Sequence, residues 1–467
     1  MIKHIVFYSI CLLLLQSQGF AEDKFLPSLN HLAGEGVTQN NEQTFLKLKL
    51  AAEQGNAKAQ FNLGYLYIIG EGVAQDYSQA FKWFKLAADQ GDAGAQNNLG
   101  NLYFQGEGVA QDYGQAIKWF KLAAEQGYVR AQNNLGYNYM KGLGVAQDYG
   151  QAFKWLMLAA DQGSAKAQFN LGDLYYEGKG VAQDYGQAFK WYKLAAEQGD
   201  AGAQYNLGDL YHEGKGVAKN YSQSFKWFRL AAEQGNAIAQ FNLGIHYKNG
   251  EGVTQDYSQA FKWYKLAAEQ GVAIAQISLG HLYMNGEGVA KNYSQAIKWY
   301  KLAAEQGNAG AQNNLGYFYY AGEGVTQDYG QAIKWFKLAA EQGDVNAQLS
   351  LGGLYIKGEG VAQDYSQALK WLKMAADQGV AIAQSSLGFF YYEGEGVAQN
   401  YSEAFKWLKL AAEQGEANAQ FMLGNLYMNG DGVAKNYSQA IKWLKLAADQ
   451  GNESAQEKLK SLKAETK

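Results

Sequence analysis

Residues Asn56 to Gly91 read NAKAQFNLGYLYIIGEGVAQDYSQAFKWFKLAADQG, and this 36-residue unit recurs eleven times, without insertion or deletion, up to Gly451. Its register is marked by eleven tryptophans at intervals of 36 residues, which are all the tryptophans of the 467-residue chain. They are Trp83, Trp119, Trp155, Trp191, Trp227, Trp263, Trp299, Trp335, Trp371, Trp407 and Trp443. Repeats of this length are typical of helical units that bury their apolar faces by stacking. The sequence therefore predicts one elongated array and not several globular domains.

Two helices are predicted within each unit. Apolar residues at helical spacing are followed by Gly70, which predicts a first helix over residues 57–69. A second helix is expected from Asp76 to about Gln90, because Asp or Asn followed three residues later by Gln or Glu forms a capping box. The stripe of this helix that is expected to be buried comprises Ala80, Trp83, Ala87 and Ala88.

Glycines predict where the two helices meet and where the chain turns. Gly64 recurs in all eleven units, although a mid-helix glycine costs about 1 kcal/mol relative to alanine, which predicts close backbone approach between the helices. The loop over residues 70–75 usually reads GEGVAQ and lacks the spacing and the Lys-Ser/Thr ending of a phosphate-binding loop. It is therefore interpreted as a turn with Val73 packed into the core.

The chain begins with a segment unlike the repeats. A short basic start precedes an apolar run from Ile5 to Leu15, and the small residues Gly19 and Ala21 follow. Residues 1–21 are interpreted as a cleavable secretory signal, since the apolar run is too short to span a membrane. Because the sole cysteine, Cys11, lies in this run, no disulfide is expected in the mature protein. We expect export to the periplasm or out of the cell, with no transmembrane segment in the mature chain.

The array is expected to have a distinct segment at each end. Residues 22–55 are predicted to form a degenerate N-terminal half-repeat or cap, because their second part matches the second half of the unit. Residues 56–451 hold the eleven full repeats, and residues 452–467 resemble the start of another. Polar residues in this last segment predict a C-terminal capping helix, which keeps stacked repeats from polymerising.

No catalytic, cofactor-binding or metal-binding residue is predicted, and the chain is not expected to be an enzyme. A catalytic group is needed once, whereas the framework recurs eleven times, and H-E-x-x-H and G-x-S-x-G do not occur. His246 replaces a usually apolar residue and is interpreted either as a hydrogen-bonded core residue or as a functional histidine. The 40 basic and 44 acidic residues are spread evenly and give a net charge of −4, so nucleic acid is not an expected partner.

The unit resembles a known family. Its pattern, A-x-x-x-L-G-x-x-Y-x-x-G-x-G-V-x-x-D-Y-x-x-A-x-x-W-x-x-x-A-A-x-x-G, resembles the Sel-one-like repeat (SLR), a relative of the tetratricopeptide repeat, from Gly34 to about Ala455. The resemblance implies an all-α, right-handed α/α superhelical solenoid of helix-turn-helix repeats. It also implies a scaffold for protein or peptide partners in bacterial envelope, signalling or host-interaction assemblies.

Two other functions remain as alternatives. A cysteine-rich branch of the family is associated with β-lactam binding or hydrolysis, which suggests a periplasmic hydrolase, although this sequence lacks those cysteines. The third hypothesis is a structural spacer without a specific ligand. The sequence does not identify the partner or the oligomeric state.

The positions that differ between repeats predict a contact surface. On the first helix they are positions 58, 61, 65, 68 and 69 of the reference unit, spaced to lie on one stripe opposite the core. The resemblance to tetratricopeptide repeats makes this stripe the concave, partner-binding face. Aromatic residues on it are either anchors for a peptide or packing between repeats. The candidates at position 65 are Tyr65, Tyr137, Asp173, Asp209, His281 and Tyr317.

An asparagine ladder runs beside this stripe. Asparagine is a poor mid-helix residue, so its recurrence needs an explanation. In tetratricopeptide-like grooves an asparagine near the Leu-Gly pair can bind the main chain of an extended peptide, and the alternative is a hydrogen bond to the neighbouring helix. The ladder comprises Asn62, Asn98, Asn134, Asn170, Asn206, Asn242 and Asn314.

An acidic cluster is the last candidate. Two like-charged i,i+4 pairs occur on the first helices of adjacent repeats, and they are Asp173 with Glu177 and Asp209 with Glu213. Such pairs are locally unfavourable, which suggests a cation or a basic peptide segment as a ligand. Lys179 and Lys215 in the same repeats favour the alternative, local charge compensation within a duplicated unit.

Overall fold

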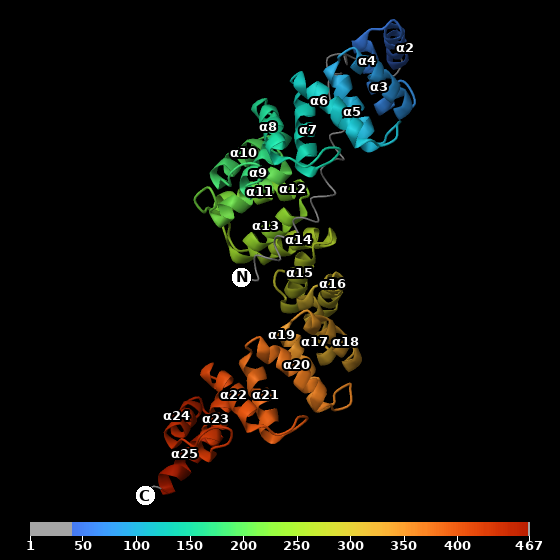
Figure 1. Ribbon diagram of the computed structural model, residues 1–467. Helices are drawn as coiled ribbons and strands as arrows, with labels where there is room; N and C mark the ends of the chain where they lie inside the picture. The colour runs from blue at the N-terminus through green and yellow to red at the C-terminus, as the bar shows by residue number, and fades with distance from the viewer. Residues whose placement is uncertain (1–39, 466–467) are drawn as a thin grey trace. The chain divides into compact units, whose positions relative to one another are not determined.

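A computed structural model describes residues 40–465, which form 24 α-helices and no strand (Figure 1). The predicted signal, residues 1–21, lies outside the described residues, and so does much of the expected N-terminal half-repeat. The chain divides into two compact units, Met1–Trp227 and Phe228–Lys467, and each is described by itself. From α2 to α11 in unit 1 and from α13 to α25 in unit 2, each helix packs against its neighbours in the chain, which confirms the all-α solenoid of 36-residue helix pairs.

The odd-numbered helices, here called A helices, open the repeats, and the even-numbered B helices close them. Unit 1 holds α2 (Asn40–Glu53), α3 (Ala57–Ile69), α4 (Tyr77–Asp89), α5 (Ala93–Gln105), α6 (Tyr113–Glu125), α7 (Val129–Lys141), α8 (Tyr149–Asp161), α9 (Ala165–Glu177), α10 (Tyr185–Glu197) and α11 (Ala201–Glu213). The boundary lies within α12 (Tyr221–Glu233). Unit 2 holds α13 (Ala237–Asn249), α14 (Tyr257–Glu269), α15 (Ala273–Asn285), α16 (Tyr293–Glu305), α17 (Ala309–Ala321), α18 (Tyr329–Glu341), α19 (Val345–Lys357), α20 (Tyr365–Asp377), α21 (Ala381–Glu393), α22 (Tyr401–Glu413), α23 (Ala417–Asn429), α24 (Tyr437–Asp449) and α25 (Glu453–Glu465).

The A helices begin and end where the sequence predicts. In the first full repeat the side chain of Asn56 accepts a 2.9 Å hydrogen bond from the amide of Ala59, which satisfies a donor at the start of α3. Gly70 ends the helix in the left-handed conformation, with φ of +72°. Glycine adopts this conformation without the Cβ strain that other residues meet.

The B helices also begin at the predicted residue, but only one of the two hydrogen-bonding directions of the predicted capping box is formed. Oδ1 of Asp76 accepts hydrogen bonds from the amides of Ser78 and Gln79, at 2.9 and 3.0 Å. The amide of Asp76 itself donates to the carbonyl of Tyr67 at 2.9 Å, and not to the side chain of Gln79. The return bond of the box is thus replaced by a backbone bond that holds the loop closed.

The recurring mid-helix glycine makes room mainly for a side chain of the B helix. A Cβ on Gly64 would lie 2.9 Å from ring carbons of Phe84, a fully buried residue of α4. In the same way, a Cβ on Gly172 would lie 2.4 Å from the ring of Tyr192. The glycine thus accommodates the bulky residue at position 84, which sequence analysis did not place in the core. The predicted close approach of backbones also occurs in some repeats, since a Cβ on Gly136 or Gly424 would lie 3.2 Å from a carbonyl oxygen of the B helix.

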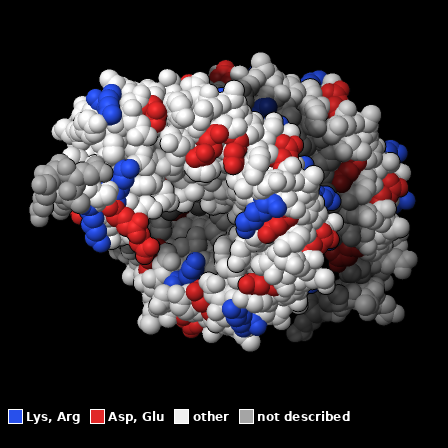
Figure 2. Space-filling view, turned by 90° about the horizontal axis from the view of Figure 1, so that it is seen from below, with Lys and Arg blue, Asp and Glu red and all other residues white. Residues whose placement is uncertain are grey.

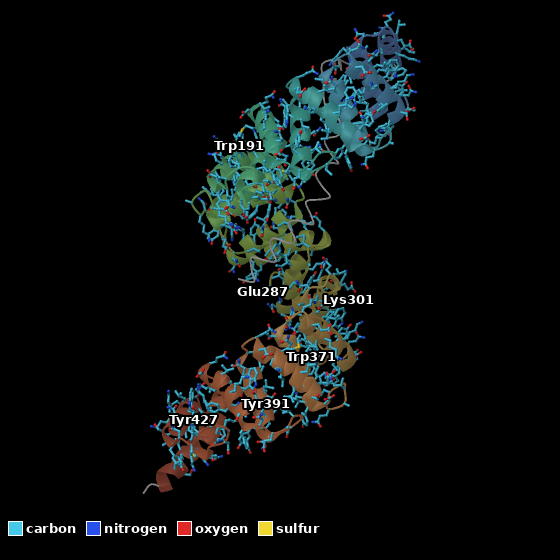
Figure 3. All side chains as sticks on the ribbon, viewed as in Figure 1. Trp191, Glu287, Lys301, Trp371, Tyr391 and Tyr427 are labelled. Atoms are coloured by element: carbon cyan, nitrogen blue, oxygen red, sulfur yellow. The ribbon has the colours of Figure 1, made fainter. Side chains whose placement is uncertain are left out.

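The tryptophans pack between repeats. Trp119 is 7% exposed and joins Ile68 and Phe84 of the preceding repeat in one buried cluster. Trp371 packs in the same way with Phe336 of α18. Side chains fill the space between the helices around Trp191 in unit 1 and around Trp371 in unit 2 (Figure 3). Each of these tryptophans therefore joins the core of its own repeat to that of the repeat before it.

A buried glutamine links three helices in most repeats, and sequence analysis did not single it out. Gln60 on α3 is 4% exposed, and its Nε2 donates to the carbonyl of Ala52 at the end of α2, at 3.0 Å. Its Oε1 accepts a 2.7 Å hydrogen bond from Nε2 of Gln90 at the end of α4. The side chain thereby satisfies a free carbonyl at the end of one B helix and fixes the next B helix.

Replacing one of these glutamines by leucine is expected to destabilise unit 2. Gln348 is 0% exposed, donates to the carbonyl of Ala340 at 3.1 Å and accepts from Gln378 at 3.0 Å. Gln348→Leu leaves that buried carbonyl unpaired, so the free energy of unfolding is expected to fall by about 1–3 kcal/mol. The control is Gln363→Leu, because Gln363 is exposed and water can replace its bond to the carbonyl of Ile356. Urea unfolding of the full chain measures the free energy of unfolding of both variants. Equal losses in the two variants would contradict a special role of the buried glutamines.

The loops place a second glycine against the preceding repeat. Gly108 has φ of +70°, and a Cβ on it would lie 2.2 Å from the carbonyl oxygen of Tyr77, the first residue of α4. Close backbone approach therefore occurs here, between a loop and the start of the preceding B helix. Val109 beside it is half-buried and packs against the core, as predicted for the equivalent Val73.

Candidate partner-binding surface

The variable positions of the A helices do not all face away from the core. Tyr65 is half-buried and packs against the cluster that contains Phe84. Ile68 is 4% exposed and belongs to that cluster. The expectation that position 68 lies opposite the core is therefore wrong for this repeat. We call the remaining variable positions together with the asparagine ladder, that is positions 58, 61, 62, 65 and 69 of each repeat, the A-helix surface.

The residues at position 65 differ in exposure. Tyr65 and Tyr137 in unit 1 are half-buried, and burial raises the pKa of each phenol. In unit 2, Tyr317 is 51% exposed and Phe389 is 41% exposed. Exposed rings of this size are candidate contact residues, whereas the half-buried ones contribute to packing between repeats.

The asparagine ladder lies between adjacent A helices. Asn98, Asn170 and Asn242 are buried, with at most 8% exposure. Nδ2 of Asn134 donates to Oδ1 of Asn97 on the preceding A helix at 3.2 Å, so this asparagine makes the bond to a neighbouring helix. Asn206 makes a 3.4 Å contact of the same kind with Asp173. Asn62 and Asn314 are half-buried, and peptide binding by the ladder stays a prediction.

In the acidic cluster each glutamate is paired with a lysine of its own repeat. Lys179 lies 2.7 Å from Glu177, and Lys215 lies 2.5 Å from Glu213. This is the charge compensation that the sequence suggests as an alternative to a ligand. The aspartates are in a different environment, because Asp173 accepts a 2.7 Å hydrogen bond from the hydroxyl of Tyr192.

The two aspartates predict a pH dependence of stability. Burial raises the pKa of Asp173 and of Asp209 to about 7, whereas an aspartate in the unfolded chain titrates near ~3.9. Between these pH values the folded state holds protons that the unfolded state has lost. The free energy of unfolding is therefore expected to fall as pH rises from about 4 to about 7, and to level off above that.

Denaturation of the wild type and of the double variant Asp173→Asn, Asp209→Asn at pH 5 and pH 8 tests this expectation. In the wild type, the free energy of unfolding is expected to be higher at pH 5 than at pH 8. In the double variant this difference is expected to be smaller by at least about 1 kcal/mol, since one pKa unit corresponds to about 1.4 kcal/mol. Glu125→Gln is the control, because Glu125 is an exposed carboxylate that is paired with Lys121 in a different repeat from the two aspartates. An unchanged pH dependence in the double variant would show that these carboxyls do not control it.

The histidines of unit 2 are packed against aromatic rings. His246 is 1% exposed, and its Nδ1 lies 2.6 Å from the carbonyl oxygen of Glu251, which confirms the hydrogen-bonded core histidine. His281 packs edge-on against Tyr300, with ring centroids 5.5 Å apart. Burial, and after it the charge of Lys248, lowers the pKa of His281.

A groove of about 640 Å³ lies in unit 2 along α21, α23 and the start of α25. Residues of the variable stripe and of the asparagine-ladder positions both line this groove. Its lining includes ladder positions Ser386 and Met422 and position-65 residues Phe389 and Asn425. Phe421, which occupies position 61 of the variable stripe, also lines it. The signal that could have found the groove is the ladder itself, in which Ser386 and Met422 replace asparagine.

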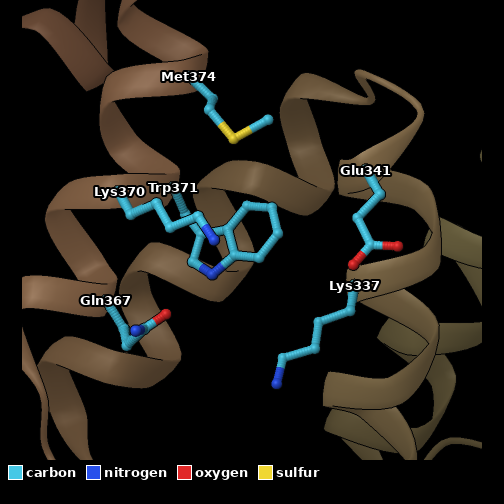
Figure 4. A pocket seen from close by; sticks show the side chains of 6 residues that line it. All are labelled: Lys337, Glu341, Gln367, Lys370, Trp371 and Met374. Carbon is cyan, nitrogen blue, oxygen red and sulfur yellow. The ribbon is translucent and has the colours of Figure 1, made fainter.

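A second, smaller hollow of about 350 Å³ lies between α18 and α20, on the B-helix side (Figure 4). The Nζ of Lys370 lies 5.4 Å from the ring centroid of Trp371, and the lysine side chain crosses the indole. Only about 5% of this tryptophan is exposed, and four of the six residues that line the hollow have charged or polar side chains. It is lined by Lys337, Glu341, Gln367, Lys370, Trp371 and Met374.

The surface charge is mixed. Basic and acidic side chains alternate over the face shown in Figure 2. Many are paired along the B helices, as in the 2.6 Å contact of Lys85 with Asp89. Among the described helices, none is both long and apolar enough to cross a bilayer.

The chain is similar to known repeat proteins. The family model described as Sel1 repeat matches twelve segments, namely residues 29–56, 57–92, 93–128, 129–164, 165–200, 201–236, 237–272, 273–308, 309–344, 345–380, 381–416 and 417–452. Among solved structures, a protective antigen of uropathogenic Escherichia coli strains with an SLR fold is 41% identical, and the match covers 91% of each chain with a TM-score of 0.80. A Sel1 repeat protein from Oxalobacter formigenes is 35% identical over 66% of this chain and 90% of that one, with a TM-score of 0.55. A comparison with curated proteins finds no match.

Proposed function

The chain belongs to the Sel1 repeat family, whose members are scaffolds that generally mediate protein–protein interaction, and on this premise we propose that it binds protein or peptide partners through its A-helix surface. The observation that carries the proposal is the groove in unit 2, where exposed Phe389 lies beside Met422 and Phe421. An apolar concavity of this kind favours burial against a partner. The packing framework is the same in every repeat, so specificity resides in the positions that differ.

The same features support a scaffold over a hydrolase. The variation between repeats is spread along many A helices, as a series of contact positions requires, whereas a hydrolase needs one centre with a nucleophile or an activated water. A structural spacer, the third hypothesis, would not need exposed aromatic residues on one surface. We therefore propose a binding scaffold that is not an enzyme.

Capture of partners with the purified chain tests the proposal. Immobilised wild type, Phe389→Ala and Leu410→Ala are each incubated with an envelope extract of the native cells, and the retained proteins are quantified by mass spectrometry. Leu410 is the matched control, because it is 40% exposed, about as much as Phe389, but lies on a B helix. A contact aromatic contributes about 2 kcal/mol or more, so Phe389→Ala is expected to reduce recovery at least about tenfold. Equal recovery by all three proteins would contradict an A-helix binding surface.

We also propose that the protein is exported. Support comes from the signal-like residues 1–21, and from the similarity to a bacterial protein that is a protective antigen. The expected mature chain begins at Glu22. Cell fractionation followed by N-terminal sequencing checks this, and a cytoplasmic protein that retains Met1 would contradict export.

A further inference from the structure

The groove in unit 2 is lined by a cluster of aromatic rings. The ring centroids of Phe389 and Phe390 are 6.2 Å apart, and those of Phe390 and Tyr365 are 5.7 Å apart. Phe390 is buried and supports Phe389, which is 41% exposed. The exposed ring is thus held in place by packing, and little conformational entropy is lost when a partner covers it.

The surface next to the groove is open because of a glycine. Position 65 is occupied by Tyr317, Gly353 and Phe389 on successive A helices, α17, α19 and α21. A Cβ on Gly353 would have no atom within 4 Å, whereas a Cβ on the preceding Gly352 would lie 2.8 Å from Leu372. Packing therefore does not require a glycine at position 353. Gly353 leaves an open space between two exposed aromatic side chains.

The rim of the groove is acidic. Glu393 and Glu395 are exposed and line it, and its lining contains no lysine or arginine. The carboxylate of Asp431 adds to the negative potential of this rim. Burial, and after it the charge of Asp431, raises the pKa of Tyr392, another residue that lines the groove. An apolar floor with carboxylates at its edge is complementary to a ligand that is apolar and positively charged.

We propose that this groove binds an extended segment of a partner protein in which a bulky apolar side chain lies next to a lysine or arginine. The apolar side chain packs against Phe389 and Phe421, and the basic group pairs with Glu393 or Glu395. Neighbouring repeats are roughly 10 Å apart and an extended residue spans about 3.4 Å, so about six residues of the segment reach from Phe389 to Tyr317. This inference rests on the proposed function and adds to it the chemistry of the partner.

Selection from a displayed library of random 12-residue peptides on the full chain tests the inference. The selected peptides are synthesised, and their binding is measured by fluorescence anisotropy at two salt concentrations. The variants are Phe389→Ala, Gly353→Tyr and the pair Glu393→Gln, Glu395→Gln. The controls are Leu410→Ala on a B helix and Tyr137→Ala on the A-helix surface of unit 1.

The informative variant is Gly353→Tyr. It places a side chain in the open space and removes a mid-helix glycine, so its Tm is expected to equal or exceed that of the wild type. Loss of binding in this variant therefore cannot come from unfolding. We expect selected peptides to be rich in aromatic or leucine residues next to Lys or Arg, and to bind at least tenfold more weakly to Phe389→Ala and Gly353→Tyr. Binding is also expected to weaken in the glutamine pair and at high salt.

Several results would overturn the inference. One is a library that yields no binder, and another is a set of acidic binders. Binders that are sensitive to Tyr137→Ala but not to Phe389→Ala would refute the groove in unit 2 and leave the proposed function standing. Binders sensitive only to Leu410→Ala would contradict both.

Discussion

Replacing Trp371 with alanine is expected to lower the free energy of unfolding by about 3–5 kcal/mol, the usual cost of deleting a large buried aromatic side chain. Trp371 is 5% exposed and lies in a buried cluster with Phe336 of the preceding repeat and Leu351 of its own. The substitution leaves a cavity at the contact between two repeats. Because stacked repeats derive much of their stability from such contacts, the effect is expected to spread to the helices on both sides.

Urea unfolding gives the free energy, and amide hydrogen exchange locates the change. We expect faster exchange in α18 to α20 of Trp371→Ala than of the wild type. The control is Leu338→Ala on α18, which is 38% exposed and should cost less than about 1 kcal/mol. A cost below about 1 kcal/mol for Trp371→Ala as well would contradict the role of the tryptophans in joining repeats.

The second large effect is expected at a loop glycine. Gly108→Ala should destabilise unit 1 by about 3–4 kcal/mol, as the sum of about 1 kcal/mol for the left-handed backbone and about 2–3 kcal/mol for overpacking. The reason is that the added Cβ would lie 2.2 Å from the carbonyl oxygen of Tyr77, which is backbone and cannot rotate away.

Gly127→Ala separates the two contributions. Gly127 has φ of +83° and also adopts the left-handed conformation, but a Cβ on it would have no atom within 4 Å. Its replacement should therefore cost only about 1 kcal/mol. Urea unfolding of the two variants measures the difference, and equal costs would mean that the loop does not pack closely on the preceding B helix.

Much of the fold could be predicted because each local signal recurs in the same register. The start of α4 at Asp76 and the end of α3 at Gly70 follow from cap chemistry that acts within a few residues. The buried role of Gln60 could not be predicted in the same way. Its partners, Ala52 and Gln90, lie on two other helices, and a glutamine on its own is usually a surface residue.

The candidate surface was harder to predict for the same physical reason. Sequence variation located the A helices, but it could not separate Ile68, which turns into the core, from Phe389, which stays exposed. That difference depends on which side chains the neighbouring repeats contribute. The groove is lined by Ser385 and Ser386 of one repeat and by Phe421 and Met422 of the next, a combination that arises only when repeats stack.

The most direct test of a partner-binding A-helix surface is site-specific photo-crosslinking in the native cells. A photoreactive phenylalanine analogue is placed at position 389 on α21, and in a second strain at position 410 on α22. Both natural residues have similar exposure, so a non-specific encounter would label the two positions alike. We predict a discrete covalent adduct with a partner protein from position 389 and none from position 410. The same adducts from both positions, or no adduct from position 389, would contradict the proposed function.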